Sequence, residues 1–188
     1  MNLLAVGLNH RTAPLDLREK LTVDNEQLAP SLNQLSGSVQ QNIIISTCNR
    51  LEIYSYSGDQ DQSYERIVDF LRSKSDLTQT DFNNHLYRLQ GKDCAEHLFR
   101  VSAGLDSMII GERQVLGQVR NAFSDATSEG YSKGPLSRLF HQALRVGRRV
   151  HRETEISKHP RSVSQAAVEL ARGIWGDLSK SKILVIGA

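Results

Sequence analysis

Residues 42–56, with the sequence NIIISTCNRLEIYSY, predict a β-hairpin that carries a cysteine at its tip. The isoleucines at 43–45 are apolar and β-branched, which is typical of a buried strand. Residues 51–56 alternate between apolar and polar side chains and predict a half-buried strand. The polar linker is short enough for a tight turn, and Asn49 tolerates the left-handed backbone that such a turn can require. We therefore expect Cys48 to be exposed in a turn that the two flanking strands hold rigidly.

Cys48 and Arg50 are the first candidates for chemistry. An arginine is a permanent cation, and a cation close to a cysteine favours the nucleophilic thiolate. The planar guanidinium also matches the geometry of a substrate carboxylate. The local sequence leaves one alternative open, a free cysteine beside a solvated arginine with no chemical role.

The segments around the hairpin predict an α+β domain. Two further strands and two helices are expected from their periodicity, at 3–8, 85–89, 26–35 and 64–71. Residues 80–84 are interpreted as a short connection. The resulting order β-α-β-β-α-β is that of a ferredoxin-like fold, with an antiparallel four-stranded sheet and helices on one face.

Beyond residue 90 the strand patterns stop and helical ones follow. Helices are expected at 93–101, 112–129, 136–153 and from Ser162 or Ser164 to Trp175, with a glycine-punctuated connection at 102–111. The final KILVIGA at 182–188 is an apolar run ending in glycine, like the first strand of a Rossmann-type domain. We expect a first domain over 1–155, the ferredoxin-like core with a helical extension, and a linking helix and first strand over 156–188.

Length and composition narrow the class of protein. The 188 residues suffice for one core and part of a second unit. No segment reaches the ~20 apolar residues of a membrane span, and the N-terminus lacks the pattern of a signal peptide. Two cysteines in different surroundings, Cys48 and Cys94, make no disulfide framework. These features predict a soluble, cytoplasmic protein without membrane contact.

The formal net charge is only +2, but the charge is distributed unevenly. Residues 1–129 contain 12 basic and 17 acidic residues, whereas residues 130–161 contain 8 basic and 2 acidic ones. A row of cations on one helix can neutralise the phosphates of a nucleic acid. The alternative is an ordinary solvated helix face. The residues concerned are Arg138, His141, Arg145, Arg148, Arg149, His151 and Arg152.

His97 lies on the helix expected at 93–101, and its role is open. Its imidazole can exchange a proton near pH 7, which suits a general base beside Cys48. It can instead be a hydrogen-bonded histidine at the edge of the core. A metal site shared with Cys94 is not expected, because no other residue nearby has ligand spacing.

Gln114 and Gln118 are one turn apart near the start of the helix expected at 112–129. Glu112 lies in the first turn and Ser107 just before it, where backbone N–H groups lack helical partners. Amides, a carboxylate and backbone donors in this arrangement suit a small polar ligand such as an amino acid. A capped, solvated helix start is the alternative.

Three further stretches are distinctive: GLNHRTAP at 7–14, STCNRLE at 46–52 and SAGLDSMIIGE at 102–112, the last continued by Gln114 and by LGQV at 116–119. Together they resemble the glutamyl-tRNA reductase family. The resemblance extends through nearly all 188 residues. It implies the NADPH-dependent reduction of glutamyl-tRNA to glutamate-1-semialdehyde, the first step of tetrapyrrole (porphyrin and haem) biosynthesis by the five-carbon route.

The resemblance also implies the chemistry and the partners of the site. Cys48 would attack the ester carbonyl of glutamyl-tRNA and form a thioester, with His97 as general base. NADPH would supply the hydride, and Gly187 and Ala188 match the first positions of its binding turn. Implied partners are glutamyl-tRNA, a second copy in a full-length homodimer, and the downstream aminomutase. Glutamyl-binding positions of the family match Thr47, Asn49, Arg50, Ser107, Glu112, Arg113, Gln114 and Gln118.

In family terms, 1–155 is the catalytic, glutamyl-binding domain and 156–188 begins a truncated NADPH-binding domain. Such a piece is expected to retain acyl-transfer and esterase chemistry without completing the reduction. Arg113 departs from the family, which usually has proline there; proline suits a first helical turn because its missing N–H would lack a partner anyway. Arginine restores that donor and adds a charge near the expected substrate.

Two other functions compete with the reductase. A non-catalytic RNA-binding module would use the basic helix and would need neither Cys48 nor His97. A thiol redox regulator would use Cys48 but would not depend on tRNA. Cys48→Ser would leave every activity of the RNA-binding module untouched, whereas the redox regulator predicts reversible oxidation at Cys48. Trapping of glutamate from charged tRNA, repeated with Cys48→Ala, tests the reductase.

Overall fold

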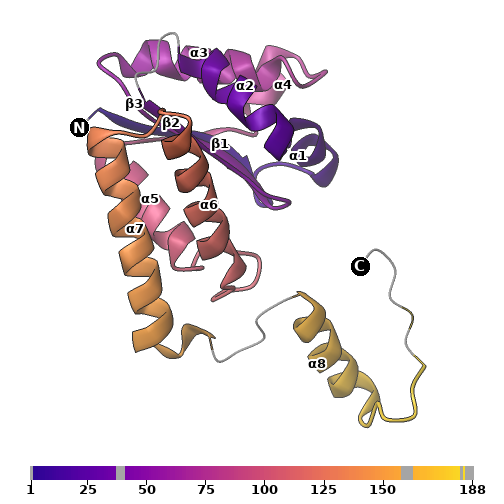
Figure 1. Cartoon of the computed structure of the whole chain (residues 1–188). Helices are drawn as coiled ribbons and strands as arrows, with labels where there is room; N and C mark the ends of the chain where they lie inside the picture. The colour runs from indigo at the N-terminus through magenta and orange to yellow at the C-terminus, as the bar shows by residue number, and fades with distance from the viewer. Residues whose placement is uncertain (1, 37–40, 158–162, 183, 185–188) are drawn as a thin grey trace.

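The computed structural model describes residues 2–36, 41–157, 163–182 and 184. A four-stranded antiparallel sheet lies at its centre, in the strand order β2-β3-β1-β4 (Figure 1). The strands are β1 (Leu3–Asn9), β2 (Gln41–Ser46), β3 (Arg50–Tyr56) and β4 (Tyr87–Gln90). The predicted hairpin is confirmed: β2 pairs with β3 from Gln41 opposite Tyr56 to Ser46 opposite Leu51.

Gly7 lies at the middle of the sheet, opposite Glu52 of β3 and opposite Tyr87 of β4. A Cβ atom at Gly7 would lie 2.9 Å from Cγ of Glu52 and 2.6 Å from the carbonyl oxygen of Leu51. Both separations are too short for non-bonded atoms, so a glycine is needed here to make room for the side chain of Glu52.

Helices cover both faces of the sheet (Figure 1). One face carries α1 (Leu15–Leu21), α2 (Asn25–Ser36), α3 (Gln60–Arg72) and α4 (Gln79–Asn83). The other carries α5 (Gly91–Ser102), α6 (Gln114–Ser128) and α7 (Gly134–Glu153). The expected connection at 80–84 is the short helix α4 instead, because the Thr78 hydroxyl accepts the backbone N–H of Asp81 and caps its start.

Coverage of both faces corrects the prediction that β3 is half-buried. Every residue of β3 except Tyr56 is buried, including the polar Glu52 and Ser55. Helices α5 to α7 occupy the face that would otherwise carry the polar side chains of an amphipathic strand. The alternation of the sequence therefore marks a buried polar cluster and not a solvated face.

The connection at 103–113 is shaped by two glycines. Gly104 has φ +74° and ends α5 in a Schellman arrangement, in which the N–H of Leu105 donates to the carbonyl of Arg100. Gly111 has φ +84° and donates its N–H to the carbonyl of Gly104 at 2.9 Å, which closes the loop. Gly111 also lies against the backbone of Ile156, in the short 3₁₀ helix Glu155–Ser157 that follows α7, with no room for a Cβ atom between them.

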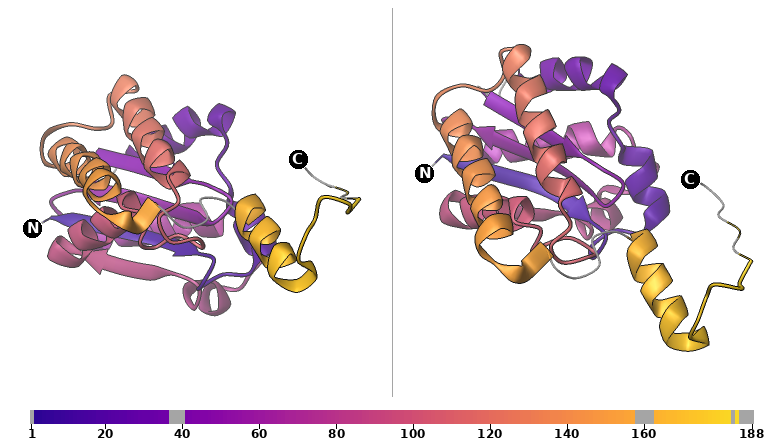
Figure 2. Two further views of the ribbon diagram at one scale, coloured as in Figure 1. Left: turned by 90° about the horizontal axis from the view of Figure 1, so that it is seen from below. Right: turned by 60° about the horizontal axis from the view of Figure 1, so that its bottom comes forward.

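Helix α8 (Val163–Trp175) projects away from the rest of the chain in Figure 1 and in the right view of Figure 2. It ends where the sequence predicted, at Trp175. Leu170, Ile174 and Trp175 are exposed on it. The strand expected at 182–188 falls mainly outside the described residues, and the two that are described, Lys182 and Leu184, are not in a strand.

Candidate active site

The tip of the hairpin is a compact turn built on Thr47. Its hydroxyl accepts the backbone N–H groups of Asn49 and Arg50, each at 3.1 Å, and its own N–H donates to the carbonyl of Arg50 at 2.9 Å. Asn49 does not take the left-handed conformation considered from the sequence, since the described residues with positive φ are all glycines. Cys48 is exposed at this tip, as predicted.

Residues that follow β1 donate hydrogen bonds to the backbone of the hairpin turn. The N–H of His10 donates to the carbonyl of Asn49 at 2.9 Å. On α1, Nη1 of Arg18 donates to the carbonyl oxygen of Cys48 and lies 3.4 Å from Oδ1 of Asn49. The backbone on both sides of the thiol is therefore fixed by hydrogen bonds to another element.

Arg50 points away from Cys48 and into the protein, where its side chain is only 2% exposed. Its Nη1 lies 2.6 Å from Oε1 of Glu52, and both Nη1 and Nη2 lie 3.1 Å from Oδ2 of Asp106. Burial lowers the pKa of Arg50, but the negative charges of Glu52 and Asp106 outweigh burial and the net shift is upward. The guanidinium thus binds two carboxylates of the protein where the sequence suggested a substrate carboxylate.

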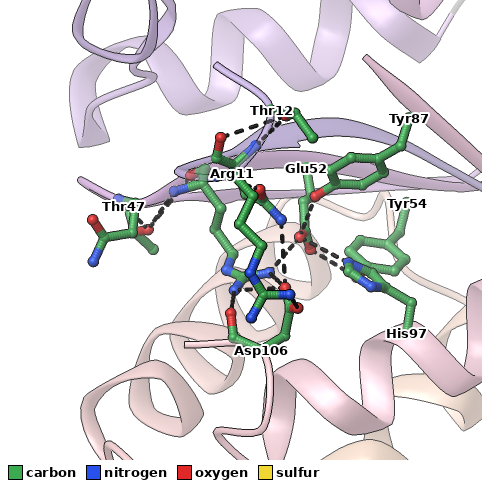
Figure 3. A network of polar contacts seen from close by, with 11 residues as sticks. Arg11, Thr12, Thr47, Glu52, Tyr54, Tyr87, His97 and Asp106 are labelled. Atoms are coloured by element: carbon green, nitrogen blue, oxygen red, sulfur yellow. Dashed lines mark hydrogen bonds and ion pairs between the residues drawn. The ribbon is translucent and has the colours of Figure 1, made fainter. Parts of the chain in front are cut away.

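Glu52 is the centre of a buried hydrogen-bond network (Figure 3). Its Oε1 accepts from Arg50 at 2.6 Å, from the Tyr87 hydroxyl at 2.6 Å and from Nε2 of His97 at 2.9 Å. Its Oε2 accepts from the Tyr54 hydroxyl at 2.7 Å. Burial raises the pKa of Glu52, but Arg50 and the hydrogen bond from His97 outweigh it and hold that pKa well below its usual range. The carboxylate is therefore ionised although it is fully buried.

His97 lies on α5 at the end of this network, away from the hairpin tip. Figure 3 shows Thr47 and His97 on opposite sides, with Asp106 and Arg11 between them. The imidazole packs edge-on against the ring of Tyr87, with 5.4 Å between centroids, and its side chain is 14% exposed. Glu52 therefore fixes the orientation of this ring.

The second cysteine is a structural residue. Cys94 is fully buried on α5, and burial together with Glu52 raises the pKa of its thiol to about 12. Within the described residues, no group of three or more histidine, cysteine, aspartate or glutamate side chains is arranged to hold a metal ion.

The glutamyl-binding candidates after α5 lie on the loop at 103–113 and on the start of α6. Ser107 follows Asp106, is 7% exposed, and its hydroxyl oxygen is buried without a hydrogen-bond partner among the described residues. Gln114, the first residue of α6, is exposed, and Gln118 one turn later is partly exposed. A buried hydroxyl without a partner costs free energy, so Ser107 is suited to accept or donate a hydrogen bond from a ligand.

Glu112 and Arg113 precede α6, and Glu112 is partly exposed. Arg113 is the residue before the first helical one and has helical angles, φ −78° and ψ −19°, so arginine is accommodated there without strain. Its side chain is exposed. The cofactor-binding candidates Gly187 and Ala188 lie outside the described residues.

Sequence reasoning missed four polar residues of this region: Arg11, Arg18, Glu52 and Asp106. The spacing of Arg50 and Glu52 was a usable signal, because residues i and i+2 of a strand share a face. Asp106 gave no such signal, since 56 residues separate it from Arg50 along the chain. It is brought there by the loop that follows α5.

Helix α7 carries the basic block. Five arginines and His141 are exposed on it, spaced three or four residues apart except for the adjacent Arg148 and Arg149, which places them along one side. His151 differs, since it is buried at the end of the helix. Arg149 and Arg152 form ion pairs with Glu153, at 3.1 and 2.6 Å. We call the exposed set the α7 ridge: Arg138, His141, Arg145, Arg148, Arg149 and Arg152.

The structure thus places a buried polar network behind an exposed cysteine on a hairpin, and comparison with known proteins assigns the chain to a family. The family model of the glutamyl-tRNA(Glu) reductase N-terminal domain matches residues 6–154. The chain belongs to this family.

Individual relatives agree with this assignment. Over the whole chain it is 45% identical to glutamyl-tRNA reductase of Carboxydothermus hydrogenoformans and 44% identical to that of Priestia megaterium, covering 42% and 43% of those proteins. The structure of glutamyl-tRNA reductase from Methanopyrus kandleri superposes with a TM-score of 0.73 at 29% identity, over 92% of this chain and 40% of that one. The chain thus spans less than half the length of these relatives. No helix among the described residues has the length and apolar character to cross a membrane.

Proposed function

We propose that this chain is the part of a glutamyl-tRNA reductase that accepts the glutamyl group from tRNA onto Cys48. The exposure of Cys48 on a turn that hydrogen bonds hold from both sides is the observation that carries the proposal. Membership of the family supports the choice of substrate.

The proposed step is an acyl transfer. The Cys48 thiolate attacks the ester carbonyl, a carbon–sulfur bond forms, and the bond from the carbonyl carbon to the ribose oxygen of the tRNA breaks. The tRNA oxygen leaves with a proton, which His97 helps to supply. The product is a glutamyl thioester, which is more readily reduced than the oxygen ester.

Reduction of the thioester to glutamate-1-semialdehyde is proposed for the full-length protein. NADPH, when bound, supplies the hydride for this step. The residues of this sequence that match its binding turn, Gly187 and Ala188, lie outside the described residues. We propose that the present chain alone forms the thioester and loses glutamate to water, as an esterase.

Thr47, Asn49, Arg50, Ser107, Glu112, Arg113, Gln114 and Gln118 are proposed to form the glutamyl site. Ser107 has the strongest support, because its buried hydroxyl has no partner among the described residues. Arg50 is the least accessible of these residues to a ligand, because its side chain is 2% exposed and its guanidinium is hydrogen-bonded to two carboxylates. We propose that it acts mainly by positioning the loop that carries Ser107.

The domain boundaries, fold type and partners of the full-length protein follow from the same proposal. The strand order β2-β3-β1-β4 supports a ferredoxin-like type for the sheet. We propose a boundary near residue 155 and a Rossmann-type NADPH domain that begins with residues 182–188. A homodimer, a contact with the downstream aminomutase and a cytoplasmic location are proposed from the family.

Trapping of the acyl group tests the proposal. The chain is mixed with tRNA charged with radiolabelled glutamate, quenched in acid and analysed for label that remains on the protein. We expect label on the unaltered chain that hydroxylamine removes, and none on Cys48→Ala. The matched control is Cys94→Ala, which should retain the label because Cys94 is buried. Label that survives in Cys48→Ala would refute the proposal.

A further inference from the structure

A groove lies at the end of the sheet that is remote from Cys48. It is lined by residues at the start of β1, at the end of β3 and on helices α5 and α7, and its volume of about 610 Å³ is within the range of small-ligand sites. Tyr56, the last residue of β3, pairs there with Leu3. Because β3 begins with Arg50 beside the hairpin tip, about 20 Å of strand separate the groove from Cys48. The groove is therefore distinct from the candidate active site.

The lining of the groove is mainly apolar and includes two aromatic rings. Phe99 of α5 and Tyr56 are partly buried, and the buried side chains of Leu3 and Leu139 extend the apolar surface. Neither ring contacts another aromatic ring among the described residues. Both rings can therefore pack against the face of a flat, unsaturated ligand.

Three polar side chains also line the groove, and all three are exposed: Asn2, Arg138 and Gln142. None of them forms a side-chain hydrogen bond or an ion pair within the part of the chain that the structure describes. A guanidinium binds phosphate through parallel N–H donors, and amide side chains hydrogen-bond to the edges of nucleobases. An apolar surface for a flat ring, with a cation and two amides beside it, matches the chemistry of a nucleotide.

The position of Arg138 favours a polynucleotide over a free nucleotide. Arg138 lines the groove and is also the first member of the α7 ridge, whose other cations continue along the helix to Arg152. Residues 138–152 span about 21 Å of helix, which is long enough to meet several phosphates of one strand. A free mononucleotide would leave the cations beyond Arg138 unused.

We propose that this groove binds one unpaired base of an RNA whose phosphate backbone lies along the α7 ridge. An unpaired base can leave its stack and be recognised by both its face and its edge, which is how proteins read single-stranded parts of RNA. The assignment of the RNA as a tRNA rests on the proposed function. The groove does not, since its lining and its position beside the ridge are independent of any chemistry at Cys48.

Filling the groove tests this inference with uncharged tRNA(Glu), so that no reaction at Cys48 is involved. Ala95 of α5 lines the groove and is only partly buried, so Ala95→Phe places a ring in it without changing the net charge. We expect the dissociation constant, measured by filter binding, to rise about tenfold, the size of one lost base stack. The factor should be the same at every salt concentration, because no phosphate contact is removed.

Two matched variants separate the contribution of the base from that of the backbone. Asn121→Phe adds the same ring at an exposed position of α6 that does not line the groove, and it should leave the affinity unchanged. Arg138→Gln removes the cation that the groove and the α7 ridge share. It should reduce the slope of log K against log salt by about 1.

Unchanged tRNA affinity in folded Ala95→Phe would overturn the inference and assign the groove to another occupant, such as a protein segment. Equal weakening by Asn121→Phe would overturn it as well, because the effect would not be specific to the groove. If circular dichroism finds Ala95→Phe unfolded, Gln142→Phe fills the groove from α7 with the same expectation. Weakened tRNA binding together with failed acyl trapping would reject the proposed function and leave the RNA-binding groove in place.

Discussion

The Nε2 atom of His97 lies 2.9 Å from Oε1 of Glu52, at the opposite end of the polar network from the hairpin tip. The sequence suggested a general base beside Cys48. The structure instead ties the imidazole to a buried carboxylate, so its ring orientation depends on Glu52. Thiol reactivity and proton delivery to the substrate are therefore expected to be separable.

We predict that His97→Ala slows acyl transfer to Cys48 by about 100-fold, the lower range of general acid–base effects, while leaving iodoacetamide alkylation of Cys48 nearly unchanged. Rapid-quench kinetics with charged tRNA gives the first rate and mass spectrometry the second. His97→Gln, which keeps a donor toward Glu52, controls for loss of the hydrogen bond. If the alkylation rate of Cys48 also fell in His97→Ala, His97 would instead be assigned the role of the base that deprotonates the Cys48 thiol.

Glu52→Gln should destabilise the fold by about 3 kcal/mol at pH 7, because it leaves the charge of the buried Arg50 under-compensated. Urea denaturation measures the change. Asp69→Asn is the matched control, because it breaks an exposed pair with Arg72 and should cost less than about 1 kcal/mol. Similar values for both variants would contradict a buried ion network.

The same variant should alter the pH dependence of stability. The folded protein holds the pKa of Glu52 below its usual range. The contribution of Glu52 is therefore fully present above the unfolded pKa of about 4.3 and is lost as the pH falls below it. The difference in stability between the unaltered protein and Glu52→Gln should begin to narrow below about pH 4.3 and should keep narrowing as the pH falls toward the lowered pKa of the folded protein, whereas a constant difference would argue against the assignment.

Two helical glycines should respond oppositely to alanine. At Gly147 of α7, a Cβ would lie 2.5 Å from the carbonyl oxygen of Ser102, so Gly147→Ala should destabilise by about 1–3 kcal/mol through overpacking against α5. At Gly117 of α6 nothing lies within 4 Å, so Gly117→Ala should stabilise by up to about 1 kcal/mol. Thermal denaturation followed by circular dichroism compares them. Destabilisation by both would show that helix α6 also needs its glycine.

The α7 ridge should contribute to tRNA binding through phosphate contacts. Arg145 and Arg148 have no ion pair among the described residues, so the double variant Arg145→Gln, Arg148→Gln should weaken binding and reduce the slope of log K against log salt by about 2. Filter binding at several salt concentrations measures it. Arg66→Gln with Arg72→Gln, on the opposite face of the sheet, is the control. An unchanged slope would indicate that tRNA phosphates contact another part of the protein.

The hydrophobic periodicity of the sequence located most helices and strands correctly, but it does not indicate which helices pack on each face of the sheet. The alternation at 51–56 identified a strand, yet its outer face is buried because α5 to α7 fold back from sequence positions far downstream. Local turn chemistry located Cys48 correctly, since Thr47 and its neighbours form the turn among themselves. The partners of Arg50 were not predictable, because Asp106 reaches it through a loop whose course is set by Gly104 and Gly111.

The tight packing of Gly111 against Ile156 brings the loop at 103–113 into contact with the 3₁₀ helix Glu155–Ser157, which is distant from it in the sequence. The loop that supports Arg50 and carries Ser107 rests directly on the first residues to leave α7. Because Gly111 leaves no space between the loop at 103–113 and residues 155–157, we expect a displacement of either segment to shift the other.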